Sequence, residues 1–270
     1  MNSLPNSRSN LFFLAITFAI TWLLWLPALL ESQTAIQIPK PIPLVLMALG
    51  IFTPSTVGIA FVVKEGQKGV LRRWFSPRLG WYWVPIVLAI PLAGLCAKLL
   101  SGLVNGEFRV EVPSLYLLPV QFAVLMLLGP VNEEFGWRGY ALPQLQKRFG
   151  AVAASLLIGT IWAFWHLPLF FIADAPQAKL PFLPFATTLI LASIVITWAQ
   201  NSTRQSMWPA LMIHTGIGLT NELFPLFDPL GGNHAAWNWA NVVLAAMAIG
   251  LISLFGAKTL SGQPPQAHTP

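Results

Sequence analysis

The stretch LYLLPVQFAVLMLLGPVNEEFGWR, Leu115 to Arg138, runs from a long apolar segment directly into three charged residues. Glu133, Glu134 and Arg138 fall within six residues, although only 9% of the chain is charged. A soluble chain carries roughly 25% charged residues. This chain of 270 residues is also 56% hydrophobic. The composition therefore predicts an all-α, polytopic membrane helix bundle, in which the three charges need an explanation.

Apolar windows of about 20 residues can cross the ~30 Å hydrocarbon core of a bilayer. The sequence contains eight candidates, of which the fourth and seventh are the least secure because they are shorter and carry polar residues. The windows are 11–30, 43–63, 82–101, 114–131, 151–173, 182–200, 206–223 and 237–257. We therefore expect about eight transmembrane helices.

The distribution of Lys and Arg predicts the orientation, because basic residues in short loops are retained in the cytoplasm. With eight spans, eleven of these residues fall on the side of the two termini, against Lys40, Arg109 and Lys179 on the other side. Both termini are therefore expected in the cytoplasm. The expected location is the bacterial plasma membrane, with multiple passes through the lipid bilayer.

Three regions are expected along the chain: N-terminal transmembrane helices over 1–110, a core over 111–257 and a disordered tail over 258–270. The tail is rich in proline and polar residues, a composition that cannot build a packed core. No basic repeat is present, so no nucleic-acid partner is expected. The single cysteine, Cys96, excludes an intrachain disulfide.

Polar side chains at membrane depth are the candidates for function. An ionisable group there costs roughly 2.5–3.5 kcal/mol on insertion scales, so it normally faces a protein interior or a wet cavity. The candidates are Asn132, Glu133, Glu134, Arg138, His166, His214, Asn221 and Glu222.

The two adjacent glutamates are expected to play different parts. In a helix, Glu134 and Arg138 are four residues apart and share a face, which favours an ion pair. Glu133 points about 100° away from Glu134, so it remains free. A carboxylate in low-dielectric surroundings holds a proton more readily than one in water, which suits a general base near neutral pH. The alternative for this segment is a solvated helix end with a surface ion pair.

His166 and His214 both lie inside predicted spans, and Pro168 is expected to loosen the helix just after His166. Each histidine alone fits a residue hydrogen-bonded inside a bundle. Together with Glu133 they form the ligand set of a hydrolytic zinc site with a fourth position for water. The same residues can instead polarise water without metal, with Glu133 as base and the histidines stabilising an oxyanion. The sequence leaves both alternatives open, and either predicts hydrolysis of a peptide or ester bond.

Other hydrolase motifs are absent from the sequence. There is no HExxH helix of the common zinc proteases and no GxSxG segment for a serine nucleophile. Asp174 and Asp228 fall in predicted loops and do not form a membrane aspartyl pair.

Three motifs resemble those of the CPBP family, the CAAX-protease and bacteriocin-processing membrane proteins also called the Abi family. EEFGWR resembles the family's EExxxR motif, WAFWH its aromatic-xxx-His motif, and HTGIG occupies the place of a third motif, His followed four residues later by Asn. The resemblance covers roughly residues 115–222. It implies that 111–257 is an intramembrane protease core related to the enzyme that removes the tripeptide after a prenylated cysteine.

The resemblance also implies roles for single residues. Glu133 would activate water, Glu134 with Arg138 would support it, and His166 and His214 would complete the water or metal site, with Trp162 as the aromatic position. Members are usually described as metalloproteases, so a zinc ion is one alternative. Gly218 departs from the family's Asn, and Asn221, almost one turn further, is a candidate substitute. The expected substrate is a hydrophobic or lipidated peptide or protein.

Two further functions remain open on the sequence. Buried Glu and His residues also suit a proton-coupled transporter, although no inverted repeat is visible. Gly218 favours a non-catalytic scaffold or immunity protein that has kept the fold.

Overall fold

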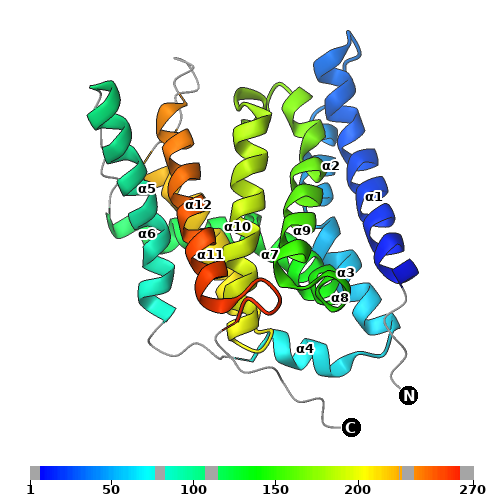
Figure 1. The fold of residues 1–270 in the computed structure, drawn as a ribbon. Coiled ribbons are helices and arrows are strands. Elements are labelled where there is room, and N and C mark those ends of the chain that lie inside the picture. Colours follow the sequence, from blue (N-terminus) through cyan, green and yellow to red (C-terminus); the bar gives the residue numbers. More distant parts are fainter. Residues whose placement is uncertain (1–6, 77–82, 107–114, 225, 227–233, 262–270) are drawn as a thin grey trace.

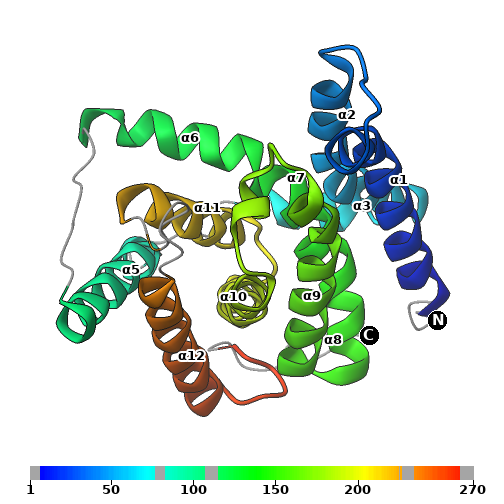
Figure 2. The ribbon, with the colours of Figure 1, turned by 90° about the horizontal axis from the view of Figure 1, so that it is seen from above.

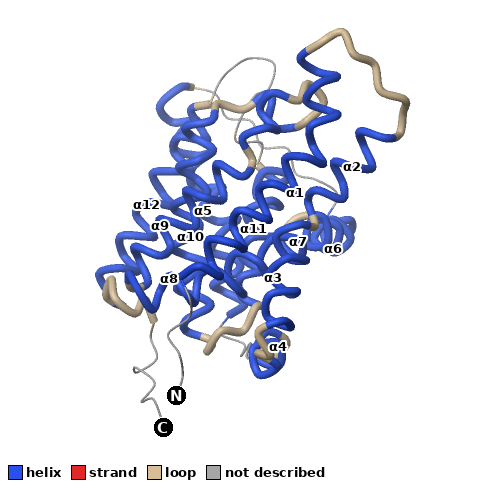
Figure 3. Tube along the Cα trace, turned by 90° about the vertical axis from the view of Figure 1, so that its right-hand side faces the viewer, coloured by secondary structure: helices blue, strands red, loops and turns tan. Residues whose placement is uncertain are grey.

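The computed structural model describes residues 7–76, 83–106, 115–224, 226 and 234–261. Within these ranges every regular element is helical, and Figure 3 shows helices and loops without a strand. The predicted all-α class is confirmed. Residues 262–270, which make up most of the expected disordered tail, lie outside the described residues.

The elements follow one another in a simple order from α1 to α12, interrupted by four short helices. The α-helices are α1 (Ser7–Gln33), α2 (Ile42–Ile51), α3 (Thr53–Lys64), α4 (Lys68–Trp74), α5 (Trp83–Asn105), α6 (Leu118–Leu128), α7 (Pro130–Glu134), α8 (Leu142–Phe149), α9 (Ala151–Trp165), α10 (Phe182–Ser202), α11 (Trp208–Leu223) and α12 (Ala235–Phe255). The short helices are η1 (Leu115–Leu117), the π-helix η2 (Phe135–Ala141), η3 (Leu167–Phe171) and η4 (Pro176–Lys179).

Five helical stretches in the described ranges are long and apolar enough to cross a membrane. They are Arg8–Gln33, Leu88–Asn105, Ala151–Phe171, Phe182–Ser202 and Ala235–Phe255. A sixth candidate joins α2 to α3 through a bend of 46°. Pro54 lies in the first turn of α3, and a proline there cannot continue the hydrogen-bond ladder of the preceding helix. The chain is thus a multi-pass integral membrane protein.

The two least secure windows, 114–131 and 206–223, do not form straight spans. Viewed from above, α10 is seen end-on, whereas α6 and α11 are seen along their length and so lie across the bundle (Figure 2). Helix α6 has only 11 residues, which rise about 17 Å. It ends at Leu128, and after the cap residue Gly129 the next helix, α7, begins at Pro130. By length and composition, the described residues thus provide five or six spans rather than eight.

Helices α6 and α11 lie across the bundle, and the segments that contain them still carry the chain from one end of the bundle to the other. In Figure 1, α5 finishes at the upper end and α9 starts at the lower end, so the segment from α6 to α8 returns the chain downward. Similarly, α10 finishes at the lower end and α12 starts at the upper end, with α11 between them. The start of α1 and the end of α12 therefore lie at the same end of the bundle. Their cytoplasmic location stays a prediction.

The first residues of the expected tail are packed rather than disordered. The carbonyl oxygen of Lys258 accepts a hydrogen bond of 2.9 Å from the backbone N–H of Ala151, at the start of α9. Leu260 is fully buried against this junction. Ordered structure therefore continues past the predicted boundary at 258.

Two glycines let the N-terminal helices touch the segment that holds the charges. A Cβ atom on Gly58 of α3 would lie 2.7 Å from the Cα of Gly136 in η2, and a Cβ on Gly136 would overlap the backbone oxygen of Pro54. Small residues permit such close approach of membrane helices. The expected regions 1–110 and 111–257 therefore share one packed interior, in which Trp25 and Val57 join Trp137 in a single core cluster.

Gly136→Ala is expected to destabilise the protein by about 1–3 kcal/mol, because the added methyl group meets backbone that cannot rotate away. Gly250→Ala is the matched control, since a Cβ on Gly250 of α12 meets nothing within 4 Å. Removing that helical glycine should stabilise the protein by about 0.5–1 kcal/mol. Thermal unfolding in detergent compares the two variants, and equal unfolding temperatures would contradict the close approach.

Candidate active site

The segment with the three charges is buried in the protein interior. All residues from Asn132 to Leu142 are buried, and the side chains of Glu134 and Arg138 have no exposed surface. Burying charges is costly unless they are paired and hydrogen-bonded. The alternative of a solvated helix end is therefore wrong, and these charges are held in place by specific partners.

Glu134 connects two cationic or potentially cationic side chains through one oxygen. Its Oε1 atom accepts a hydrogen bond of 3.0 Å from Nη1 of Arg138, which is the ion pair predicted from the spacing. The same atom lies 2.8 Å from Nδ1 of His214 on α11. The buried carboxylate of Glu134 thus connects α11 to the helical segment that carries the EExxxR motif.

The local helix differs from the α-helix assumed in the prediction. From Phe135 to Ala141 the chain forms a π-helix, with the wider turn that arises where one extra residue enters a helix. Residues four apart still face the same side in this geometry, so the pair of Glu134 and Arg138 forms. Such π-helical turns occur frequently at functional sites.

Glu133, next to Glu134 in the sequence, has a different hydrogen-bond partner. Its Oε2 atom accepts a hydrogen bond from the indole N–H of Trp162 on α9. Glu133 is 6% exposed, so its carboxylate is buried beside an aromatic ring rather than solvated. The two neighbouring glutamates therefore occupy distinct environments.

The indole of Trp162 lies at the centre of the cluster. Besides its bond to Glu133, the ring lies under the guanidinium of Arg138, with Cζ 4.5 Å from the ring centroid. It packs edge-on against His214, with centroids 4.9 Å apart, and lies 6.1 Å from the ring of His166. One side chain therefore contacts or neighbours four of the five residues predicted as catalytic.

His166 occupies the end of α9, where the helix gives way to the 3₁₀ turn η3 that contains Pro168. The predicted loosening at this proline is confirmed. Nδ1 of His166 lies 2.9 Å from the carbonyl oxygen of Trp162 and must donate its proton to it. Nε2 is then the ring nitrogen left for water or substrate. The ring is held between Trp165 and Phe185, with centroids 4.7 and 5.2 Å away.

Known proteins resemble this chain over the segment that carries these residues. A family model described as Type II CAAX prenyl endopeptidase Rce1-like matches residues 115–220. A protein named CAAX prenyl protease 2, from Methanococcus maripaludis, is 31% identical over 235 residues, which are 80% of this chain and 85% of the relative. The chain belongs to the Rce1-like family of CAAX prenyl endopeptidases. It is therefore a membrane-embedded protease, and the family predicted from the three motifs is confirmed. The bacterial plasma membrane stays a prediction.

The side chains of this Rce1-like protein do not form the expected metal triad. Within the described ranges, no three His, Cys, Asp or Glu side chains lie together as a metal ion would require. Glu133 meets an indole N–H, and Nδ1 of each histidine is held by Glu134 or by a carbonyl oxygen. These contacts use Nδ1 and leave Nε2 of each histidine open, an orientation that metal-ligating histidines also adopt. The zinc site at Glu133, His166 and His214 therefore stays a prediction, and no step is assigned to a metal.

Asn221, the candidate substitute for the family's Asn, does not join the site. It is exposed in the last turn of α11, as is Glu222. Asn221 lies seven residues beyond His214, which places it about 10 Å further along the helix axis. Gly218 itself has room for a side chain, because a Cβ there would meet only Leu125, at 3.9 Å.

Two residues that sequence reasoning missed contact Arg138 from α10. Ser193 accepts a hydrogen bond of 2.7 Å from Nη2, and Gln200 donates one of 3.1 Å to the backbone oxygen of Arg138. Their seven-residue spacing within an apolar helix was the available signal, since it places both on one face.

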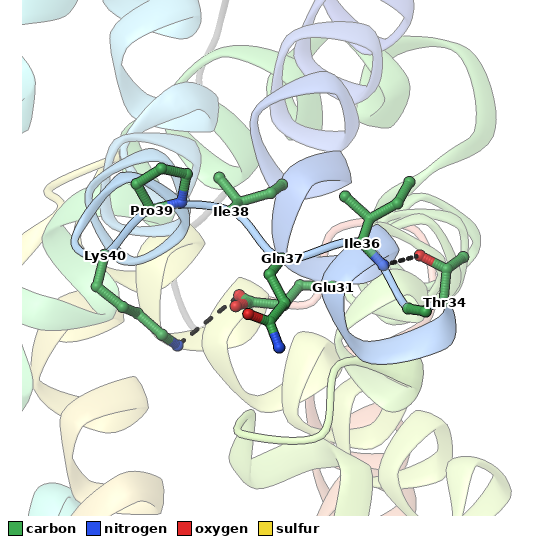
Figure 4. A pocket seen from close by; sticks show the side chains of 8 residues that line it. Glu31, Thr34, Ile36, Gln37, Ile38, Pro39 and Lys40 are labelled. Atoms are coloured by element: carbon green, nitrogen blue, oxygen red, sulfur yellow. Dashed lines mark hydrogen bonds and ion pairs between the residues drawn. The ribbon is translucent and has the colours of Figure 1, made fainter.

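A separate pocket lies in the loop between α1 and α2 (Figure 4). Its lining runs from Glu31 to Lys40, and these two residues form an ion pair of 3.7 Å. None of the lining residues belongs to the buried cluster, so this pocket is not the site of the chemistry described above.

Proposed function

We propose that this protein is a glutamate-dependent intramembrane endopeptidase in which Glu133 activates the attacking water. The observation that carries the proposal is the separation of the two glutamates. Glu134 forms a salt bridge with Arg138, whereas Glu133 forms none among the described residues and accepts a hydrogen bond from an indole N–H. A carboxylate in that setting can take a proton from water.

In the proposed reaction, water gives one proton to Glu133 as its oxygen bonds to the peptide carbonyl carbon. The carbonyl oxygen becomes an oxyanion. When this intermediate collapses, the C–N bond breaks and the proton held by Glu133 passes to the leaving nitrogen. Glu133 is then a carboxylate again, and the reaction consumes only the peptide and one water molecule.

His214 is proposed to stabilise the oxyanion. In the imidazolium form of His214, Nδ1 donates to Glu134 and Nε2 can donate to the developing charge. Arg138 fixes Glu134 and so fixes the imidazole. His166, whose Nδ1 donates to the carbonyl of Trp162, presents Nε2 as an acceptor in its neutral form and is proposed to hold the attacking water. Donors held in place before reaction cost no rearrangement when the charge forms.

The proposed substrate is the C-terminal segment of a lipidated membrane protein. The relative's name specifies a CAAX prenyl substrate, in which a cysteine near the C-terminus carries a prenyl chain. A site buried among membrane helices favours a substrate that already resides in the bilayer. The scaffold alternative rests only on Gly218, and no observation here favours a transporter.

The test is cleavage of a farnesylated CAAX peptide by the purified protein, followed by mass spectrometry of the products. We expect release of the three residues after the cysteine, with the same rate in the presence of a chelator such as 1,10-phenanthroline. Loss of the activity on chelation, and its recovery with zinc, would contradict the metal-free mechanism. Absence of cleavage for farnesylated and geranylgeranylated peptides alike would contradict the substrate.

A further inference from the structure

Helix α10 carries an unexpected row of buried polar side chains. Ser193, Thr197 and Gln200 have no exposed surface, although they lie in a helix that is otherwise apolar enough to span a membrane. Their spacing of four and three residues places them on one face. A buried polar group is costly unless it is hydrogen-bonded, so the partners of these residues show what the face does.

Two of the three residues bind Arg138, one at its guanidinium and one at its backbone oxygen. The hydroxyl oxygen of Ser193 accepts from the guanidinium Nη2 at 2.7 Å. The side-chain amide of Gln200 donates to the backbone oxygen of Arg138 at 3.1 Å. Thr197, between them, has no hydrogen-bond partner for its hydroxyl within the described part of the chain.

These contacts matter because the guanidinium is planar and its donors are fixed relative to one another. When Ser193 holds Nη2, Nη1 is directed to Oε1 of Glu134, at 3.0 Å. That oxygen also holds Nδ1 of His214, at 2.8 Å. A continuous chain of hydrogen bonds therefore runs from α10 through Arg138 and Glu134 to His214.

The hydrogen bond from Gln200 to the backbone of Arg138 supports the π-helix in which Arg138 lies. Hydrogen bonds in a π-helix join residues five apart, and this geometry persists where surrounding groups support it. Gln200 supplies such support at the carbonyl group of Arg138 itself. The backbone oxygen and the guanidinium of Arg138 are thus both held by α10.

We propose that Ser193 and Gln200 are positioning residues for the peptidase reaction, acting through Arg138 and Glu134 on the orientation of His214. This inference rests on the proposed function. Neither residue is assigned a contact with substrate. Their loss should therefore lower kcat and leave KM nearly unchanged.

The kinetic test compares Ser193→Ala and Gln200→Met with two matched controls. Thr197→Val removes the hydroxyl that has no partner among the described residues, and Ser155→Ala removes a fully buried hydroxyl that donates to Ala151 of its own helix. We expect kcat to fall roughly tenfold in the first two variants, as the loss of one charge-assisted bond implies for Ser193. The controls should stay within about twofold of wild type, the range left by changes below 0.5 kcal/mol.

A second measurement does not depend on activity. The chain has four histidines, so the ring ¹⁵N resonances of histidine-labelled protein can be assigned by single replacements. Ser193→Ala should shift the resonances of His214, and Thr197→Val should leave them in place. Unchanged His214 resonances in Ser193→Ala would overturn the inference.

Failure of this inference and failure of the proposed function have different signatures. Glu133→Gln is assayed beside the α10 variants. If Glu133→Gln cleaves as fast as wild type, the proposed function fails. If Glu133→Gln is inactive but Ser193→Ala and Gln200→Met match Thr197→Val, only the positioning role is wrong.

Discussion

Glu133→Gln is expected to lower kcat for cleavage of a prenylated peptide by about a thousandfold, while the protein keeps its fold. Glutamine has the shape of glutamate, and its side-chain oxygen can still accept the hydrogen bond from the indole of Trp162. What it loses is the ability to take a proton from water. The variant therefore separates the proposed chemistry from the packing of the site.

The size of this effect follows from the part assigned to Glu133. A positioned general base contributes about 10²–10⁴ to a rate. The other carboxylate, Glu134, has an oxygen without a hydrogen-bond partner among the described residues, but its charge is paired with Arg138 and its side chain has no exposed surface. We therefore expect little compensation from its neighbour.

The measurement is single-turnover cleavage of the farnesylated peptide by wild type, Glu133→Gln and a control. Glu31→Gln is a suitable control, because Glu31 lines the separate pocket between α1 and α2, where it pairs with Lys40. Its rate should equal that of wild type. Cleavage by Glu133→Gln within tenfold of wild type would rule out Glu133 as the base.

Several features of this site were predictable because they depend on local spacing or composition. The apolar windows gave an all-helical membrane protein, and the four-residue separation gave the pair of Glu134 and Arg138. Pro168 correctly marked the end of the helix at His166. Each of these follows from a rule that involves residues close together in the chain.

The direction of a helix in the bundle was not predictable in the same way. An apolar stretch indicates that a helix avoids water, and a helix lying across the interior meets that condition as well as one that spans the bilayer. Helices α6 and α11 are of this kind (Figure 2). The break at Gly129 and Pro130 was visible in the sequence, but its angle depends on packing.

The contacts between distant segments also lay beyond sequence reasoning. Trp162 and Glu133 are 29 residues apart, and Arg138 and Ser193 are 55 apart. Gly136 appeared as an unspecified position inside the EExxxR motif. Its importance comes from Pro54, whose backbone oxygen occupies the space that a side chain would need.

Arg138→Met is expected to produce the largest loss of stability among single substitutions in the cluster, about 3–5 kcal/mol. The side chains of Arg138 and Glu134 have no exposed surface, and the arginine supplies the closest permanent positive charge to that carboxylate. Methionine fills a similar volume but leaves Glu134 as a buried charge without its counter-charge. Thermal unfolding in detergent should show a decrease of roughly 10 °C.

The double variant Glu134→Gln, Arg138→Met tests the cause of this loss. Removing both charges replaces an ion pair with neutral groups of similar size, and such replacements are often neutral or stabilising. The double variant should therefore unfold at a higher temperature than Arg138→Met alone. Arg73→Met, which removes an exposed arginine on α4, serves as the control and should unfold like wild type.

In the double variant, stability is expected to recover while activity stays low. Its fold should be recovered, but His214 no longer has a carboxylate to hold Nδ1, so cleavage should stay low. If Arg138→Met unfolds at the wild-type temperature, the arginine does not compensate the charge of Glu134. If the double variant is as unstable as the single one, the loss comes from packing around the π-helix. Recovered stability with absent activity would show that the ion pair is kept for its orientation of the imidazole, since the fold can exist without it.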